Sequence, residues 1–566
     1  MIKKETRDLI VAQALQEIQF ARQYKQGKTS SWKKNEDLYY GKKVKSEEAR
    51  ANVDLNRMQE FVHTFLSKID NSLTFKFVHR KVSQITRVKR LNSLRQYDAN
   101  RDMWDFKDIV GKKQAVIYGR AIYSYFADSA TGYQPHLENV DVYDFLVDPS
   151  GGGVQLENCM YMGRYGVVKT TSQLKEGVKS GMYLKYPTTD LINGSGNSTE
   201  TSQEETNKNS RTYDTRVTTA QKEIGNKDKY KFWEWYTTYE GERYYLLLNE
   251  TGANAIRLEK LKDIFESDLF PFWTYACFPD LTEFWVPSPA DYVREIFMAQ
   301  AVSINQMLDN AEQINKPQRV VDITMIEDLA SLKYRRDGYI KSKGDVSKAI
   351  REVFVPSINT PIEVFNILET IQEKSSGVTA ASKGIAEEDK VGIYEGNQEN
   401  TADRFGLINK AYAFGYQRFA RLYEEGVREH LTKKVAVDIL GPNGVEIEEV
   451  SRKDIFWKGD MFGITVEASN AELALSMGEK KLKLGFLQAN AMNPIQNPKK
   501  AYETEASING FTEEEIRQLM DTQNFGDADL MSEAERDIEM IMDGKKIEVN
   551  RKASIAYKQR FLDFVL

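Results

Sequence analysis

Residues 27–30, Gly-Lys-Thr-Ser, end like a phosphate-binding loop, and such a loop would bind ATP. The complete pattern is GxxxxGK[ST]: its backbone N–H groups surround the phosphates, and its lysine reaches the outer ones. The first glycine would have to stand five positions before Gly27, where this chain has Arg22. Because the motif is incomplete, the sequence predicts no nucleotide site here.

Carboxylates offer a second chemistry, a divalent metal site, since Asp141, Asp144 and Asp148 lie close together in the chain. Asp148, however, begins an Asp-Pro turn, and aspartate favours turns for backbone reasons. The four histidines and two cysteines form no HxH, HExxH or CxxC pattern (His63, His79, His136, His430, Cys159 and Cys277). Neither a metal nor another cofactor is predicted, and the two thiols are expected to be reduced and buried.

Other catalytic patterns are also missing from the sequence. There is no GxSxG elbow, no GxGxxG after a strand and no HRD and DFG pair. The acidic runs at 387–389 and 513–515 are explained by a solvated loop and by the first turn of a helix. No enzyme is predicted. A metal-dependent nuclease built on scattered acidic residues is the weaker alternative.

Composition narrows the class of protein further. A length of 566 residues, 41% hydrophobic residues and 29% charged residues are typical of a soluble globular protein with several modules. No run of 18 apolar residues occurs, so no membrane span is expected, and the charged, helix-patterned start does not resemble a signal peptide. The net charge is −6, so the protein surface as a whole is not expected to attract nucleic acid.

One long helix is expected to organise the molecule, after an aromatic segment at 270–287 that is broken by prolines. Ser288 is a good N-cap, Pro289 suits the first helical position, and Asp291 places a negative charge in the first turn. Residues spaced three and four apart then form one stripe: Val293, Phe297, Gln300, Ile304, Met307, Ala311 and Ile314. Lys316-Pro317 ends the pattern, so the helix would be roughly 40 Å long.

A second helix is expected to run back beside the first. Residues 317–361 form a small, locally basic insert of short strands (319–323, 339–341 and 353–355) and one helix, and a helix follows at 362–376. This order favours an antiparallel helix pair that carries a small domain at its tip. Residues 378–400 contain three glycines and are expected to be a loop before a long helix that begins at 401.

The rest of the chain predicts an α+β fold. Helices are expected at 5–26, 53–70, 101–118, 471–490, 511–523, 532–543 and 549–566, and strands at 73–78, 121–128, 142–148, 159–168, 231–239, 243–250, 435–441 and within 451–469. Residues 27–40 are expected to be a turn with aromatic anchors, and 191–228 a mobile insertion.

A basic helix contains Arg80, Lys81, Arg87, Lys89, Arg90 and Arg95. It would present either a binding face for an acidic partner or an ordinary solvated face.

The order of these parts resembles the portal proteins of tailed bacteriophages. The segments that carry the resemblance are WKKNEDLYYG (32–41), IYGRAIYSYF (117–126), VDVYDFLVDPSGGG (140–153), FPF with FWVPSPAD (270–291), and SSGVTAASKG (375–384). Each segment alone is weak, and their shared order covers most of the chain. The main alternative is another capsid-associated assembly protein that has no DNA channel.

The resemblance implies a role for each part. Residues 1–287 and 401–470 would form the α/β wing, 288–316 and 362–377 the two stem helices, 317–361 the small α/β clip, 378–400 the tunnel loop, and 471–566 a helical crown. Lys383, Lys390, Asn397 and Gln398 would face DNA from the tunnel loop, and Arg335, Arg336, Lys341 and Lys343 would dock an adaptor at the clip.

The resemblance also implies partners and a location. Copies of the chain would assemble as a dodecameric ring at a capsid vertex of the virion, after synthesis in the host cytoplasm. The ring would carry double-stranded DNA and bind terminase, a head-completion or adaptor protein, and the major capsid and scaffold proteins. It would have no membrane partner.

Overall fold

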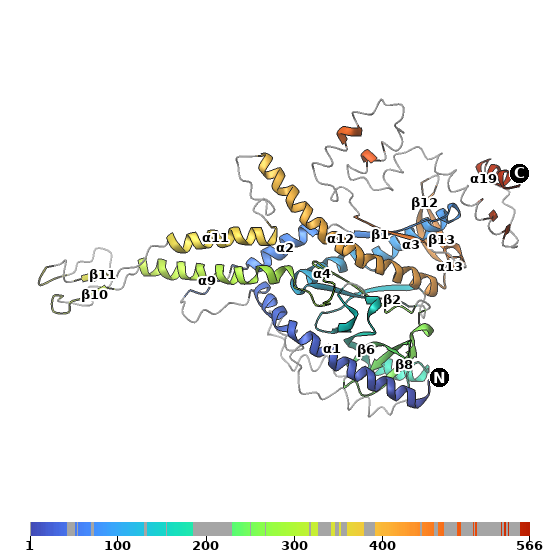
Figure 1. The fold of residues 1–566 in the computed structure, drawn as a ribbon, viewed down its shortest axis with the longest axis horizontal. Helices are drawn as coiled ribbons and strands as arrows, with labels where there is room; N and C mark the ends of the chain where they lie inside the picture. The colour runs from blue at the N-terminus through green and yellow to red at the C-terminus, as the bar shows by residue number, and fades with distance from the viewer. Residues whose placement is uncertain are drawn as a thin grey trace.

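Most of the chain forms a body from which one pair of helices projects, with a small β-hairpin at the far end of the pair (Figure 1). The computed structural model describes residues 2–41, 51–53, 55–69, 73–128, 133–153, 156–184, 229–249, 251–265, 268–315, 319–326, 341–345, 350–352, 359–378, 391–441, 444–457, 462–468, 484–487, 502, 504–506, 534, 537–538, 541–542 and 555–565. The mixture of helices and strands agrees with the predicted α+β class. The predicted insertion at 191–228 lies outside the described residues.

A five-stranded antiparallel sheet lies against the N-terminal helix α1 (Lys4–Tyr39). Its order is β4 (Phe145–Val147), β5 (Tyr161–Thr170), β6 (Lys229–Tyr239), β7 (Glu242–Leu248) and β8 (Ala255–Lys260). The apolar stripe of α1, including Ile18, shares a core with Trp233 and Trp235 of β6. The predicted hairpin joins β6 to β7 through Glu240 and Gly241, whose positive φ angles match a type I′ turn.

Helix α1 is longer than the sequence predicted. The expected turn at 27–40 is helical as far as Tyr39, so this prediction was wrong. Trp32 is buried, and its ring meets the rings of Trp285 and Tyr143 edge-on, with centroids 5.1 and 5.5 Å apart. Packing of these aromatic residues in the core therefore outweighs the polar composition of the segment.

A three-stranded sheet forms the centre of the body, in the order β3 (Gln134–Asn139), β2 (Arg120–Asp128) and β9 (Phe272–Ala276). Helices α4 (Trp104–Tyr118) and α12 (Val391–His430) contact it. Trp273 lies between the rings of Tyr123 and Phe419, with centroids 4.1 and 4.8 Å away. Gly415 lets α12 approach this closely, because a Cβ there would lie 2.7 Å from the Thr274 carbonyl oxygen.

The basic helix and the helix expected at 101–118 are both present, and the second begins three residues later than predicted. Helix α3 (Ile85–Arg101) ends where α4 was predicted to begin, and Asp102 and Met103 separate the two helices. Met103 has φ 52° and ψ 49°, in the left-handed region that a residue with a side chain rarely adopts. The chain therefore turns sharply at a methionine rather than at a glycine.

The basic residues of α3 are used within the chain. Arg87 is buried and lies over the Trp457 ring, Arg95 is buried over Phe75, and Arg90 forms an ion pair with Glu448. Neither reading of this helix from the sequence, a binding face or a solvated face, holds for these three arginines. The cause is tertiary packing, which the local charge pattern does not contain.

The projecting pair consists of α9 (Pro289–Asn315) and α11 (Asn359–Ser376), which lie side by side (Figure 1). The bounds of α9 match the prediction, and α11 begins three residues earlier than expected. At the far end, β10 (Arg319–Val321) pairs antiparallel with β11 (Ile350–Glu352). Strand 319–323 is thus confirmed in part, whereas the strands predicted at 339–341 and 353–355 lie almost wholly outside the described residues.

The remaining elements complete the body. Helix α2 (Arg57–Ile69) precedes β1 (Leu73–Val78), which pairs with β14 (Gly463–Ala468), and β12 (Val435–Gly441) pairs with β13 (Gly444–Val450). Short helices α5 (Thr171–Lys179) and α13 (Arg452–Ile455) follow β5 and β13, and α19 (Ile555–Val565) lies near the C-terminus. The predicted strand 142–148 is limited to β4, because the chain turns at Asp141. Most of the C-terminal helices predicted from 471 onward lie outside the described residues.

Candidate functional site

Three segments that are distant in the sequence meet just before α9. Arg120, which follows Gly119 at the start of β2, donates hydrogen bonds of 2.7 Å to the carbonyl oxygens of Gly153 and Phe284. Its guanidinium also lies over the Phe284 ring, 4.1 Å from the centroid. Burial lowers the pKa of Arg120 to about 10, so the side chain remains charged at neutral pH. One buried cation thus ties the segment 280–288 to the body.

Glycines allow these segments to come so close together. Gly119 has φ 93°, and a Cβ there would lie 2.2 Å from the carbonyl oxygen of Val286. A Cβ on Gly153 would lie 2.0 Å from the carbonyl oxygen of Asp280. The glycines of the IYG and DPSGGG segments therefore allow the backbone of both segments to pack directly against the FWVPSP segment. The body thus holds the residues that precede α9 on two sides.

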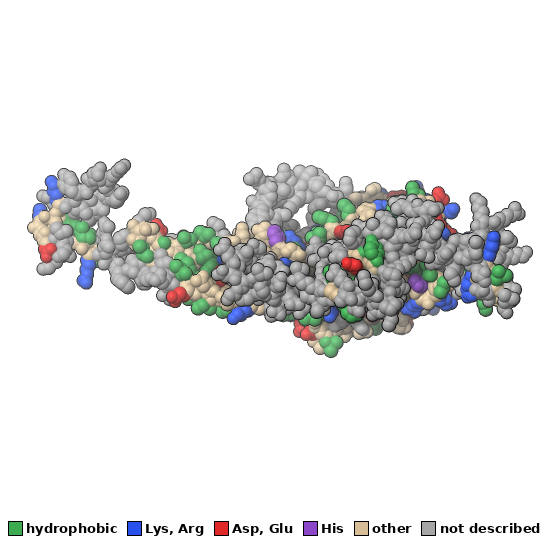
Figure 2. Space-filling view, turned by 90° about the horizontal axis from the view of Figure 1, so that it is seen from above, with side chains coloured by type: hydrophobic (Ala, Val, Ile, Leu, Met, Phe, Trp, Pro, Cys, Tyr) green, Lys and Arg blue, Asp and Glu red, His purple; other side chains and the backbone are tan. Residues whose placement is uncertain are grey.

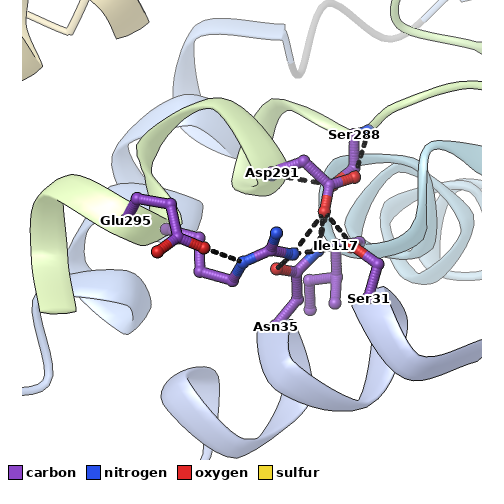
Figure 3. A network of polar contacts seen from close by, with 7 residues as sticks. Ser31, Asn35, Ile117, Ser288, Asp291 and Glu295 are labelled. Carbon is purple, nitrogen blue, oxygen red and sulfur yellow. Dashed lines mark hydrogen bonds and ion pairs between the residues drawn. The ribbon is translucent and has the colours of Figure 1, made fainter.

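The N-terminus of α9 is capped by its own residues. The Ser288 hydroxyl accepts a hydrogen bond of 3.0 Å from the Asp291 N–H, and the Asp291 carboxylate accepts one of 2.8 Å from the Ser288 N–H. This reciprocal pair confirms the predicted N-cap. The same carboxylate accepts hydrogen bonds from Ser31 and Asn35 of α1, at 2.6 and 3.0 Å, as Figure 3 shows.

Arg294 completes the polar network between α9 and α1. Its guanidinium contacts Asp291 at 2.8 Å, Ser31 at 2.6 Å and Asn35 at 3.1 Å. Burial by itself would raise the pKa of Asp291, but hydrogen bonds from Ser31, Ser288 and Asn35 outweigh it and hold the pKa below its ordinary value. A charged carboxylate with partners on two helices fixes the direction in which α9 leaves the body.

A second set of contacts holds the sides of the helix pair. Asn305 of α9 accepts a hydrogen bond of 2.8 Å from the Val53 N–H, and Asp309 accepts one of 2.8 Å from the Ala51 N–H. Arg57, at the start of α2, forms an ion pair of 3.1 Å with Glu369 of α11. Ala51, Val53 and Arg57 therefore fasten both helices to the body. No local sequence pattern marks this role, because each contact joins residues that lie more than 250 positions apart.

The predicted stripe on α9 divides into two halves. Val293, Phe297 and Gln300 are buried within this chain, and Phe61 of α2 lies against Phe297 with centroids 6.0 Å apart. Of the other predicted residues, Ile304, Met307 and Ala311 are half-buried and Ile314 is exposed. The first half of the stripe therefore belongs to the core of this chain.

Other apolar residues of the pair remain exposed. They are Val302, Leu308 and Ile314 on α9, and Ile362, Val364, Ile367 and Ile371 on α11. Figure 2 shows hydrophobic side chains along the projecting part of the molecule. A signal was present in the sequence, because α11 has two adjacent apolar rows: one with Phe365 and Leu368, and one with Val364, Ile367 and Ile371. Such a helix is apolar over more of its circumference than one neighbour can cover.

Comparison with protein families decides the identity of this arrangement. A family model described as the phage SU10 portal protein matches residues 124–509, more than half of the chain. The chain belongs to the phage SU10 portal protein family. The resemblance drawn from the order of the sequence segments is thereby confirmed. No curated protein matches the chain.

The family match covers only part of this portal protein's site. It includes β9, both helices of the projecting pair, the hairpin at its tip and all of α12. It begins within β2 and so excludes Ser31, Asn35, Arg57 and Arg120. The residues that fasten the pair from α1 and α2 thus come from the part of the chain outside the match, and only the structure shows them.

The predicted adaptor-docking residues of the portal protein are described in part. Lys341 and Lys343 are exposed near the tip, where the Lys343 N–H donates to the Met325 carbonyl oxygen at 2.9 Å. Ile326 and Ser342 form an isolated β-bridge beside them. Arg335 and Arg336 lie outside the described residues.

The predicted tunnel loop is shorter than expected. Helix α12 begins at Val391, ten residues before the predicted start, so Asn397 and Gln398 are helical and the loop assignment was wrong for 391–400. Once a helix is nucleated, each further residue adds a hydrogen bond, so the helix continues through Gly392 and Gly396 although each glycine costs about 1 kcal/mol relative to alanine. Lys383 and Lys390 lie outside the described residues.

The aspartates that could suggest a metal site have structural roles instead. Asp148 accepts hydrogen bonds from the Ser150 and Met160 N–H groups, at 2.8 and 2.9 Å, and Asp141 accepts one from the Tyr143 N–H. These carboxylates shape turns, as the Asp-Pro pattern predicted. Among the residues the structure describes, no three His, Cys, Asp or Glu side chains are grouped as metal ligands. No described helix is both long and apolar enough to span a membrane.

Proposed function

We propose that this portal protein assembles as a closed, dodecameric ring whose central channel carries double-stranded DNA into and out of the capsid. The observation that supports the ring best is the projecting pair of α9 and α11, with exposed apolar side chains on both helices. Large apolar patches are rarely left in water. Identical pairs placed side by side around an axis would cover one another.

Each part of the chain then has a place in the ring. Helices α9 and α11 form the stem, residues 317–361 the clip, 379–390 the tunnel loop, and 471–566 the crown. The wing contains the body up to residue 287 together with residues 401–470. The clip docks the adaptor or head-completion protein and terminase, and the wing contacts the capsid and scaffold proteins at one vertex of the virion.

The charge of the projecting pair supports a channel through which DNA slides. Helices α9 and α11 together carry seven acidic and two basic side chains. Proteins that hold DNA tightly neutralise phosphates with lysine and arginine. A stem with the opposite charge balance repels the DNA backbone and does not retain it. The energy for packaging would come from the separate terminase.

The ring is tested by the mass and shape of the purified protein. We expect particles of about twelve chains with a central opening, seen by native mass spectrometry and electron microscopy. A monomer or dimer at every concentration would contradict the ring. A closed particle without an axial opening would favour the alternative, a capsid-associated assembly protein that has no channel.

The channel is tested by shortening the predicted tunnel loop. Deletion of residues 380–388 removes most of the segment between Val378 and Val391 and leaves α11 and α12 intact. We expect normal rings that package or retain DNA poorly in an in vitro packaging reaction. Full packaging by the deletion variant would show that the loop does not act on DNA.

A further inference from the structure

Helix α4 is apolar on two sides, but the body covers only one of them. The covered side contains Trp104, Ala115, Val116 and Ile117, all buried in the main core. On the other side Met103, Phe106, Ile109 and Val110 form what we call the α4 outer face, and they are 63%, 66%, 43% and 41% exposed. Phe106, Ile109 and Val110 lie three and four apart on one side of the helix, and Met103 precedes its first turn as the N-cap residue. A cluster of apolar side chains left in water on a packed helix marks an interaction surface.

Met103 provides a second, independent sign that the α4 outer face has a purpose. It adopts the left-handed conformation with φ 52°, which glycine accepts without strain and a larger residue does not. Most of its side chain is exposed, so contacts within the chain do not explain the methionine. The turn between α3 and α4 sets the backbone conformation, whereas the exposed methionine side chain is free to contact a partner, and strained positions of this kind cluster at functional sites.

We propose that the α4 outer face binds a second copy of this chain, the neighbouring subunit of the ring. This inference rests on the proposed function. A ring requires each subunit to present different surfaces to its two neighbours, so apolar patches beyond the stem are expected. The α4 outer face belongs to the body, where α4 contacts α9. The contact between subunits would then extend from the stem into the body.

The size and chemistry of the α4 outer face fit this occupant. Its four side chains expose on the order of 400 Å², about half of what one partner buries in a standard interface. That area is too small to hold a dimer by itself, and it suits one contact among several between ring neighbours. The four residues carry no charge; beside them Lys107 is paired with Asp102 at 2.5 Å, and Asp105 is an exposed carboxylate. An apolar face whose exposed charged neighbour is negative fits an apolar contact with another subunit better than DNA or an acidic partner.

The first test replaces one side chain of the α4 outer face. Phe106→Gln keeps a good helix former and removes the aromatic ring, and Phe20→Gln is the matched control, because Phe20 is 59% exposed on helix α1. We expect rings of the Phe106 variant to dissociate on dilution at a protein concentration higher by about tenfold or more. The Phe20 variant should behave as the wild type. Mass photometry over a dilution series measures both.

The second test separates the contact from folding. Met103→Gly relieves the left-handed strain and removes the side chain, so its Tm should stay the same or rise while its rings weaken. Glu240→Gly relieves similar strain, at φ 49° in the β6–β7 turn, and should leave ring stability unchanged. Weaker rings from a chain that folds at least as well support an interface. Unchanged rings from both the Met103 and Phe106 variants would overturn the proposal.

A photocrosslink identifies what lies against the face. With p-benzoylphenylalanine at position 106 of the full-length chain, purified rings should give covalent dimers after irradiation, with crosslinked peptides from this chain. Rings that assemble normally but give no such crosslink would overturn the inference and leave the ring intact. If the wild-type chain forms no ring at any concentration, the proposed function itself fails, and the unmodified protein alone shows this.

Discussion

Single ionisable residues hold distant parts of the body together, and Asp98 is the clearest case. It is fully buried on α3 and accepts hydrogen bonds from Tyr133 at 3.0 Å and from Tyr423 of α12 at 2.9 Å. Burial raises the pKa of Asp98 to about 6, and the two tyrosines and Arg101 offset this only in part. The sequence shows an ordinary helical aspartate. Its environment comes from residues 35 and 325 positions away, so no local pattern could predict it.

Replacing Asp98 should make stability less dependent on pH. Its folded-state pKa lies above the ordinary value of 3.8, so the ionised form is disfavoured by folding. The destabilisation that Asp98 contributes should therefore decrease as the pH falls from 7 through 6 towards 4. Asp98→Asn keeps an acceptor for the tyrosines and should stabilise the protein at pH 7 by up to about 3 kcal/mol. The gain should shrink as the pH approaches 4.

Thermal unfolding between pH 4.5 and 8 measures this effect. Asp105→Asn, at an exposed position of α4, is the matched control for loss of a carboxylate. Parallel stability curves for wild type and the Asp98 variant would show that burial of this group has no energetic consequence.

Gln300 should tolerate an apolar replacement for a similar reason. It is fully buried on α9, and neither its amide oxygen nor its nitrogen has a hydrogen-bond partner among the residues that the structure describes. A buried amide without partners costs free energy that a leucine of similar length does not. Gln300→Leu should stabilise the chain by about 1–3 kcal/mol. A lower Tm than wild type would contradict this, and Gln306→Leu at an exposed position of α9 is the control.

Among the elements, α9 shows which features can be predicted from the sequence, its two ends, and which cannot, the residues that cover it. Its bounds could be predicted because the signals are local: Ser288 caps it, Pro289 starts it and Lys316-Pro317 follows its end. The start of α12 could not be predicted, because packing of its later turns decides where it begins. What covers α9 was equally hidden, since Phe61 and Val53 reach it across more than 200 residues.

A proline in the middle of α9 should abolish the ring. Ile304 is half-buried, eleven residues before the end of the helix, and a proline there removes a hydrogen bond and clashes with the preceding turn. The cost is about 3 kcal/mol or more. Ile304→Pro should therefore sediment as monomers, whereas Ile304→Ala, which keeps the helix, should still form rings. Normal rings from the proline variant would refute the stem assignment.

At the scale of the whole molecule, the helix pair of α9 and α11 is anchored to the body at its base, and its tip lies far from the body (Figure 1). Three sequence segments that carried the portal resemblance meet at the base, around Arg120, and the polar network of Asp291 and Arg294 fixes the direction of α9. The order of segments along the chain was enough to find the family. Their convergence was not predictable, because it depends on glycine contacts between separate strands and loops.

This separation allows docking at the tip to be changed without disturbing the ring. Lys341 and Lys343 are exposed at the tip, and the contacts that hold the helix pair are made at its base and along its sides by other residues. Lys341→Glu with Lys343→Glu should form normal rings and bind the adaptor protein more weakly, with the largest difference at low salt because exposed charges are screened. Lys433→Glu with Lys434→Glu is the matched control, an exposed pair beside β12 in the body. Lys341 and Lys343 lie in the segment assigned to the clip, whereas Lys433 and Lys434 do not. If both double variants bind the adaptor equally well at low ionic strength, the docking surface lies elsewhere.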